Sequence, residues 1–348
     1  MSPLTRFRAD EAHVPTNMMI EYYEQRASVP GTMLITEATF ISDEAAGYDR
    51  PPGIWSNDQV AAWKKITDAV HAKHSYIYCQ LWALGRTASP EFLRKKGYDL
   101  TSASALPVDE HVPRALTEEE IPKWIDAYTY AAEAAIRAGF DGVEIHGANG
   151  YLIDQFLQDV SNHRTDEWGG SIENRSRFAL SVAKAVADAI GPDRTGIRLS
   201  PFTTVQGMGM DDPEPQFSHV IEGLRKLDLA FIHIVLGTHR KGYEVGPNGA
   251  ATPAMVDFIF KAWGNGPTVI LAGRFEPETA KKAVEEEYQG KEIVIGFGRH
   301  FISNPDLPYR IEHGLDLTPF DTATFYAKGD PVGYSDYSFS PEFLKASL

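Results

Sequence analysis

Three polar side chains follow one of the most apolar segments of the chain, and their types suit carbonyl chemistry. The segment is Gly142-Val-Glu-Ile-His146, and Asn149 and Tyr151 come three and five residues after the histidine. Two neutral hydrogen-bond donors that leave a buried strand can hold one carbonyl oxygen between them. A neighbouring tyrosine can deliver a proton to the same compound. The spacing therefore predicts a site that polarises and protonates a carbonyl compound, with a hydrogen-bonded core histidine as the ordinary alternative for His146.

Apolar runs of strand length alternate with helical segments along all 348 residues. The runs are continuously apolar, which is typical of a parallel sheet covered on both faces. Alternating strands and helices leave a doubly wound sheet or a (β/α)8 barrel. The predicted strands are Thr32–Phe40, Tyr76–Ala83, Gly142–His146, Thr195–Pro201, Ala230–Leu236, Thr268–Gly273 and Ile293–Gly298. The predicted helices are Met18–Ala27, Asn57–Lys73, Glu119–Ala138, Asn174–Ile190, Pro215–Lys226, Pro253–Trp263, Pro277–Tyr288 and Asp306–Glu312.

The order of these elements favours the barrel, because the eighth strand that a barrel needs has only one possible position in the chain. An eighth strand would have to precede the first helix, and Met1–Thr5 is the segment that remains there. We therefore expect an α/β protein in which residues 1–348 form a single (β/α)8 TIM barrel domain, truncated in its first strand. The tail, from about residue 315 to 348, is rich in Tyr, Phe, Pro and Gly, and we expect it to pack on the barrel.

Polar side chains recur at the predicted carboxyl ends of the strands, where barrels carry their chemistry. Each has a structural alternative: a buried Gln80 can satisfy backbone groups, and Arg198 can pair with a structural carboxylate. Independent structural roles would not require all of them to fall on one rim, so their common position favours a functional site. These strand ends carry Thr5, Glu37, Gln80, His146, Asn149 and Arg198.

The loops after the last two predicted strands both contain a glycine followed by an arginine. They are Gly273-Arg274 and Gly298-Arg299. Glycine lets backbone N–H groups approach phosphate oxygens, and arginine adds a fork of charged donors. Barrels often bind phosphate with these two loops, so the pattern favours a phosphate site over two solvated arginines.

Composition and missing motifs exclude several other classes of protein. The chain has 33 basic and 48 acidic residues, a formal net charge of -15, so nucleic acid and anionic membranes are poor partners. The single cysteine, Cys79, fits a reducing compartment, and no apolar run approaches the ~18 residues that span a bilayer. The start of the chain is not a signal peptide, so we expect a cytoplasmic protein. Dinucleotide, P-loop and zinc-protease fingerprints are absent from the sequence.

The motifs together resemble the Old Yellow Enzyme family, whose members are FMN-dependent ene-reductases and NADPH dehydrogenases. Some stretches are most similar to its fungal branch, which includes chanoclavine-I aldehyde reductases. The match runs from Met1 nearly to the end of the chain. The motifs that carry it are Pro3-Leu-Thr-Arg6, Ile35-Thr-Glu-Ala-Thr39, Cys79-Gln-Leu-Trp82, Gly142-Val-Glu-Ile-His146, Asn149-Gly-Tyr151, Ser161-Asn-His-Arg-Thr-Asp166, Gly169-Gly-Ser-Ile-Glu-Asn-Arg175 and Gly296-Phe-Gly-Arg-His-Phe-Ile-Ser-Asn-Pro305.

The resemblance implies a barrel with non-covalently bound FMN, NADPH as reductant, and no metal. It implies that His146 and Asn149 grip the carbonyl of an enone or enal, and that Tyr151 protonates the α-carbon after the flavin donates hydride to the β-carbon. NADPH and the alkene would use the same flavin face in turn, in ping-pong fashion. The implied cofactor-binding residues are Pro3, Leu4, Thr5, Ala38, Gln80, Arg198, Gly273, Arg274, Gly298 and Arg299. The implied substrate-pocket residues are Tyr48, Trp82 and Tyr326.

Two departures from the family pattern keep alternatives open. Relatives carry a further N-terminal hairpin before the first strand, and Arg274 replaces an asparagine that is common among them. A truncated barrel with impaired flavin binding and no catalysis is therefore one alternative. A flavin-dependent isomerase on the same scaffold is another, although Tyr151 favours reduction. The family pattern leaves a monomer or a homodimer as the expected assembly.

Overall fold

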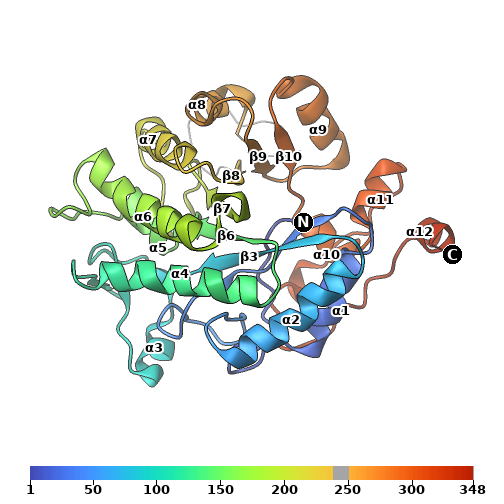
Figure 1. The fold of residues 1–348 in the computed structure, drawn as a ribbon, viewed down its shortest axis with the longest axis horizontal. Coiled ribbons are helices and arrows are strands. Elements are labelled where there is room, and N and C mark those ends of the chain that lie inside the picture. Colours follow the sequence, from blue (N-terminus) through green and yellow to red (C-terminus); the bar gives the residue numbers. More distant parts are fainter. Residues whose placement is uncertain (238–250, 348) are drawn as a thin grey trace.

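A computed structural model describes residues 1–237 and 251–347, and a curved parallel sheet forms its centre (Figure 1). The strand order is β1-β3-β6-β7-β8-β9-β10, with β2 paired to β3. Every pair in this sheet is parallel. The strands are β1 (Met33–Ile35), β2 (Thr39–Phe40), β3 (Tyr76–Trp82), β6 (Gly142–Gly147), β7 (Thr195–Leu199), β8 (Phe231–Val235), β9 (Thr268–Ala272) and β10 (Ile293–Ile295). A separate pair joins β4 (Thr101–Ser102) to β5 (Arg114–Ala115).

Helices cover the outside of the sheet, so its strands are buried on both faces (Figure 1). Each residue of β6 is buried, which explains why this strand is continuously apolar except where it carries function. The longer helices are α1 (Asn17–Arg26), α2 (Asn57–His71), α4 (Ile121–Arg137), α6 (Ile172–Ile190), α7 (Glu214–Arg225) and α8 (Pro253–Trp263). The shorter ones are α3 (Pro90–Lys96), α5 (Leu152–Leu157), α9 (Pro277–Lys282), α10 (Arg299–Ser303), α11 (Leu307–Glu312) and α12 (Pro341–Ala346).

The first two residues of the chain lie between β1 and β10. The Met1 amine donates to Met33 O at 2.6 Å, and Ile35 N donates to Met1 O at 2.9 Å, which is the pattern of a parallel pair. On the other side, Ser2 N donates to Phe297 O at 2.9 Å. These bonds link the two ends of the sheet just below the segment that begins the predicted site.

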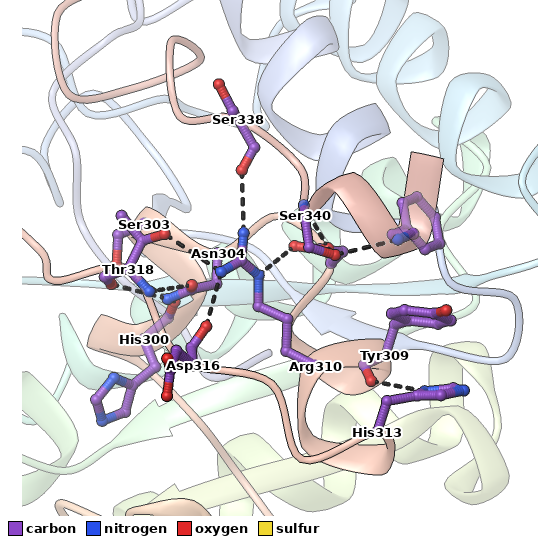
Figure 2. Close-up of polar contacts among 12 residues, drawn as sticks. His300, Ser303, Asn304, Tyr309, Arg310, His313, Asp316, Thr318, Ser338 and Ser340 are labelled. Atoms are coloured by element: carbon purple, nitrogen blue, oxygen red, sulfur yellow. Dashed lines mark hydrogen bonds and ion pairs between the residues drawn. The ribbon is translucent and has the colours of Figure 1, made fainter. Parts of the chain in front are cut away.

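The C-terminal tail is fastened to the α10–α11 region by a hydrogen-bond network (Figure 2). Asp306 Oδ2 accepts from Ser340 N at 2.8 Å and from Ser340 Oγ at 2.6 Å, while its Oδ1 accepts from Arg310 Nε at 2.8 Å. Asn304 Nδ2 donates to Thr318 O at 3.1 Å, and Asn304 Oδ1 accepts from Thr318 N at 2.7 Å. These bonds hold the tail against the α10–α11 region.

The α/β barrel with a parallel sheet is confirmed, and two of the predicted elements are divided. The expected strand Thr32–Phe40 is divided into β1 and β2, because Glu37 and Ala38 leave the ladder between them. The expected helix Pro277–Tyr288 ends as α9 at Lys282 and continues as a wider turn over Ala283–Glu287. None of the described helices is long and apolar enough to cross a membrane.

Candidate active site

A cavity of about 460 Å³ opens where the strands of the sheet end. Every residue predicted for catalysis or the substrate pocket lies on its wall, as do the predicted cofactor residues outside the glycine-arginine loops. The N-terminal segment, the end of β1, and the strands β3, β6 and β7 supply most of the wall, and the tail supplies Tyr326. The lining residues are Pro3, Leu4, Thr5, Phe7, Ala38, Tyr48, Gln80, Trp82, His146, Asn149, Tyr151, Arg198 and Tyr326.

Strand register brings the charged and polar residues of this wall to one level. His146 in β6 lies opposite Arg198 in β7, and Arg198 lies opposite His233 in β8. Residues paired in this way point to the same face of a sheet. The parallel ladder therefore places an imidazole and a guanidinium side by side at the cavity floor, as their positions at strand ends predict.

Below this level, a buried carboxylate fixes two of the side chains. Gln80 Nε2 donates to Glu144 Oε1 at 2.8 Å, and Glu144 Oε2 lies 2.7 Å from His233 Nδ1. Because the amide nitrogen of Gln80 is engaged with Glu144, its orientation toward the cavity is set. Arg198 lies close enough for the Glu144 charge to raise its pKa, against the larger lowering effect of burial.

The imidazole of His146 is uncharged near neutral pH. Burial lowers the pKa of His146 well below its usual value, and the neighbouring Arg198 charge acts in the same direction. A neutral imidazole still donates one N–H, which suits a hydrogen bond to a carbonyl oxygen. His146 Nδ1 has no hydrogen-bond partner within residues 1–237 and 251–347.

Tyr151 stands over His146 and is protonated at neutral pH. The two ring centroids are 4.8 Å apart at an interplanar angle of 77°. Burial raises the pKa of Tyr151 to about 12, and the Gln206 side chain beside it acts in the opposite direction. A phenol with this pKa keeps its proton until a stronger base, such as a carbanion-like carbon, is presented to it.

Aromatic rings form the outer wall and the mouth of the cavity. Trp82 stacks on Phe40 at 4.8 Å and meets the Tyr151 ring edge-on at 4.9 Å. At the mouth, the Phe7 ring lies 6.2 Å from the Tyr48 ring and 5.9 Å from the Tyr326 ring. Tyr326 is 64% exposed, so this side of the cavity faces solvent.

Phe7 was not among the residues predicted from the sequence. It follows Thr5 by two positions, and this spacing in an extended segment places both side chains on one side. Its backbone has φ 60°, an uncommon left-handed conformation for a bulky residue. Sequence spacing could have suggested Phe7, but it could not have revealed that conformation. Glu144, the buried partner of Gln80, and His233, which contacts Glu144, were likewise missed.

The glycine-arginine loops lie next to the cavity wall rather than on it. Gly273 and Arg274 follow β9, while Gly298 precedes α10, which begins at Arg299. A side chain at Gly273 would meet Leu236 Cβ at 2.8 Å, so glycine is required there. The Arg299 guanidinium lies 5.2 Å from the centre of the Phe320 ring. These residues are positioned at two neighbouring loops, and phosphate binding by them stays a prediction.

The chemistry of the wall fits a flat heteroaromatic group with hydrogen-bonding edges. Trp82 Nε1, His146 Nδ1 and Arg198 Nε are buried polar atoms of the wall without hydrogen-bond partners among the described residues. Ala38 is only 3% exposed and presents a small side chain to the cavity. Such atoms are rare in folded proteins unless a ligand or water engages them. No group of three His, Cys, Asp or Glu side chains in the described part of the chain could hold a metal ion.

Comparisons with known proteins agree with this geometry. The model of the "NADH:flavin oxidoreductase / NADH oxidase family" matches residues 1–318. "Chanoclavine-I aldehyde reductase fgaOx3" of Penicillium roqueforti is 55% identical over 99% of this chain and 93% of its own length. "Probable inactive reductase easA" of Epichloe festucae var. lolii is 51% identical over 99% of this chain and 92% of its own length.

Among solved structures, the Old Yellow Enzyme homologue of Zymomonas mobilis is 41% identical. It superposes with a TM-score of 0.87 over 97% of this chain and 94% of that chain. The agreement covers the barrel and the strands that carry the cavity. The chain is therefore an oxidoreductase of the NADH:flavin oxidoreductase / NADH oxidase family, with the barrel of an Old Yellow Enzyme.

Proposed function

We propose that the protein reduces the C=C bond of α,β-unsaturated carbonyl compounds, using FMN and NADPH. One observation carries the proposal: His146, Asn149 and Tyr151 line the same cavity as the unpartnered guanidinium Nε of Arg198. Bound FMN would accept hydride from NADPH and donate it to the β-carbon of the substrate. Thr5, Ala38, Gln80 and the glycine-arginine loops are the residues that would hold it.

The residues of the chain perform the rest of the chemistry. His146 and Asn149 donate to the substrate carbonyl oxygen, which withdraws electron density and makes the β-carbon electrophilic. Tyr151 then donates its proton to the α-carbon. Arg198 places a fixed positive charge at the cavity floor, where it would favour negative charge on bound FMN. Trp82 and the mouth aromatics exclude water from one face of the substrate.

The proposal is tested with purified protein and 2-cyclohexenone. We expect a yellow protein that releases FMN on denaturation, is bleached by NADPH without oxygen, and is reoxidised by the enone. In deuterated water the product should carry deuterium at the α-carbon. Tyr151→Phe should lower the rate of reoxidation by the enone roughly 100- to 10,000-fold, while reduction by NADPH persists.

A second candidate is an FMN-binding barrel without turnover, because one relative is named a probable inactive reductase. A protein that binds FMN and is bleached by NADPH but never reoxidised by any enone would support it. Isomerised enone without NADPH consumption would instead indicate isomerase chemistry. A protein that cannot be reconstituted with FMN would contradict the proposed function altogether.

A further inference from the structure

The turn that carries Asn149 and Tyr151 has an unfavourable backbone conformation that needs support from neighbouring groups. Asn149 has φ 59° and Gly150 has φ 79°, so two successive residues are left-handed. Asparagine tolerates this region better than most residues, but it still needs support from its surroundings. Tyr151 returns to an extended conformation and immediately precedes α5. The directions of both side chains therefore depend on what fixes this turn.

Asp154, in α5, accepts hydrogen bonds that fix it. Gly150 N donates to Asp154 Oδ2 at 2.8 Å. Asn149 N donates to Ser200 Oγ at 2.7 Å, and the Ser200 hydroxyl donates to Asp154 Oδ2 at 3.5 Å. Ser200 directly follows β7, two residues after Arg198. One carboxylate oxygen thus gathers both left-handed N–H groups and ties the turn after β6 to the end of β7.

The opposite side of the turn is also closed. Gln155 Nε2 donates to Gly150 O at 2.7 Å and to Leu84 O at 2.9 Å. A Cβ atom at position 150 would lie 2.8 Å from Gln206 Cβ, so Gly150 cannot be replaced without displacing its neighbours. The carbonyl side is therefore held by Gln155, and the N–H side is held by Asp154.

The surroundings of Asp154 require the ionised carboxylate. Its Oδ1 accepts from Gln158 Nε2 at 2.9 Å, so each of its described partners is a donor. An asparagine amide at this position would direct its NH2 group at one of those donors. Gln158 could rotate its amide to accept it, but Gln158 Oε1 would then lose its 2.9 Å bond from Gly209 N. The ionised carboxylate therefore suits these donors better than a neutral side chain does.

We propose that Asp154 is a positioning residue for the reaction: its ionised carboxylate, acting through Gly150 and Ser200, holds Asn149 and Tyr151 at the reacting carbonyl. The inference rests on the proposed function and adds a residue that touches neither substrate nor flavin. Asp154 is fully buried and does not line the cavity. It acts entirely through the backbone of the turn.

The proposal predicts that the reaction slows at acidic pH. Burial raises the pKa of Asp154 to about 6, while the donors Gln158, Gly150 and Ser200 and the facing charge of Arg86 lower it. Protonation adds a hydrogen to a carboxylate that is surrounded by donors, so the turn should loosen as the pH falls through about 6. Neither the neutral His146 nor the protonated Tyr151 changes charge in that direction over this range. Glu37, whose pKa burial raises to about 7, supports the N-terminal segment instead, and its titration persists in Asp154→Asn.

The test compares Asp154→Asn with Asp159→Asn, an exposed aspartate just past the same helix. FMN content and the melting temperature come first, to show that each variant folds. Stopped-flow reoxidation of the reduced flavin by 2-cyclohexenone is then followed from pH 5 to 8. We expect wild type and Asp159→Asn to share an acid limb near pH 6. Asp154→Asn should lack this limb and should be roughly 10- to 100-fold slower at pH 7.

Ser200→Ala supplies the second arm, because it removes the acceptor of Asn149 N–H and leaves the carboxylate. It should slow reoxidation several-fold, and adding it to Asp154→Asn should cost little more, since the two residues act in one chain. Asp154→Asn that matches Asp159→Asn in rate and pH profile overturns the inference. If Asp154→Asn does not fold, an unaltered Ser200→Ala overturns it. Failure of wild type itself to reduce the enone would instead count against the proposed function.

Discussion

Two segments of the cavity wall contain a left-handed residue, and each is held by a buried carboxylate. In the turn after β6, Asn149 has φ 59° and Asp154 is the carboxylate. In the N-terminal segment, Phe7 has φ 60°, and Glu37 Oε2 accepts from Arg6 N at 3.1 Å. Each carboxylate receives backbone N–H groups, and neither lies on the cavity surface. A buried carboxylate that accepts from the backbone thus supports both the turn at the substrate carbonyl and the N-terminal segment at the cavity mouth.

The two supports differ in how far along the chain they reach. Asp154 is four residues from Gly150, within one turn of the helix that follows. Glu37 is 31 residues from Arg6 and comes from the break between β1 and β2. Apart from the link through Ser200 to the end of β7, the first support forms within its own loop, whereas the second requires the barrel to bring distant segments together. The carbonyl side is therefore the locally determined half of the site.

The N-terminal segment is further joined to the tail by two buried arginines. Arg6 Nη2 donates to Gly333 O at 2.7 Å, and its Nε donates to Phe325 O at 3.0 Å. Arg8 donates to five backbone carbonyls, those of Arg6, Thr324, Phe325, Asp330 and Val332. Phe7 and Tyr326 consequently form one wall whose two halves come from opposite ends of the chain.

Removal of the Asn149 side chain should have the largest effect on the locally held half. Asn149→Ala loses a hydrogen-bond donor to the substrate carbonyl. It also places an alanine at φ 59°, where alanine lacks the polar side chain that helps asparagine to adopt this backbone conformation. Asn149→Gly loses the same donor but adopts this conformation without strain. We expect both to lower kcat/KM for an enone roughly 100- to 1,000-fold.

Comparison of Asn149→Gly with Asn149→Ala separates the effect of the lost hydrogen-bond donor from the effect of backbone strain. Asn149→Gly should keep the wild-type melting temperature more nearly than Asn149→Ala, because only the latter is strained. Equal activity of wild type and either variant would show that Asn149 does not hold the carbonyl. A much larger activity loss in Asn149→Ala than in Asn149→Gly would indicate that the turn conformation, rather than the donor, decides the rate.

The sequence predicted the locally held half well, because its determinants are short-range. Apolar strands that end in polar residues identified the barrel rim, and strand register then places His146 beside Arg198. The spacing of Asn149, Gly150 and Asp154 could also have suggested a carboxylate-held turn. The confirmed family resemblance supplied the cofactor, which no spacing in the sequence could name.

The contacts that hold the other half could not be predicted, because they are long-range. Nothing in the run of residues around Phe7 indicates that Glu37 holds it or that Tyr326 packs against it. Arg6 and Arg8 look like ordinary surface charges in the sequence, yet both are 0% exposed. Their partners are backbone carbonyls of the tail, and a carbonyl carries no sequence signal.

Replacement of Arg8 should affect the long-range half alone. Arg8→Lys keeps the charge but loses the planar fork that reaches five carbonyls, and it leaves some of them unsatisfied. We expect the free energy of unfolding to fall by roughly 2–4 kcal/mol, measured by urea titration. Hydrogen exchange should accelerate in residues 322–334 and remain slow in residues 148–157.

The matched control is Arg225→Lys, a half-buried arginine at the end of α7 that pairs with the exposed Asp228. It should change stability by less than about 0.5 kcal/mol. If Arg8→Lys accelerated exchange equally in both segments, the two supports would form one cooperative unit and the proposed separation would fail.

A pH-dependent effect is expected from the charge of Glu37. Burial raises the pKa of Glu37 from 4.5 to about 7, while the N–H groups of Arg6 and Phe7 and the charges of Arg6 and Arg8 lower it. Between these pH values the folded protein binds a proton that the unfolded chain has released. The contribution of Glu37 to stability therefore falls as the pH rises from 4.5 to 7, by on the order of 3 kcal/mol. Asp154 has the same sign over a lower window, because its pKa is raised from 3.8 to about 6.

Glu37→Gln removes this titration and keeps a side chain of the same shape. Its unfolding free energy relative to wild type should therefore increase from pH 5 to pH 8 in urea titrations, whereas Glu312→Gln, at an exposed position, should show no such trend. The flavin should meanwhile bind more weakly at pH 8 to Glu37→Gln than to wild type, because the anion that accepts from the backbone of Arg6 and Phe7, next to Thr5, is gone. If the stability difference between Glu37→Gln and wild type stays constant or decreases as the pH rises, ionised Glu37 does not destabilise the folded protein. Only Asp154 would then hold a functional loop at the expense of stability.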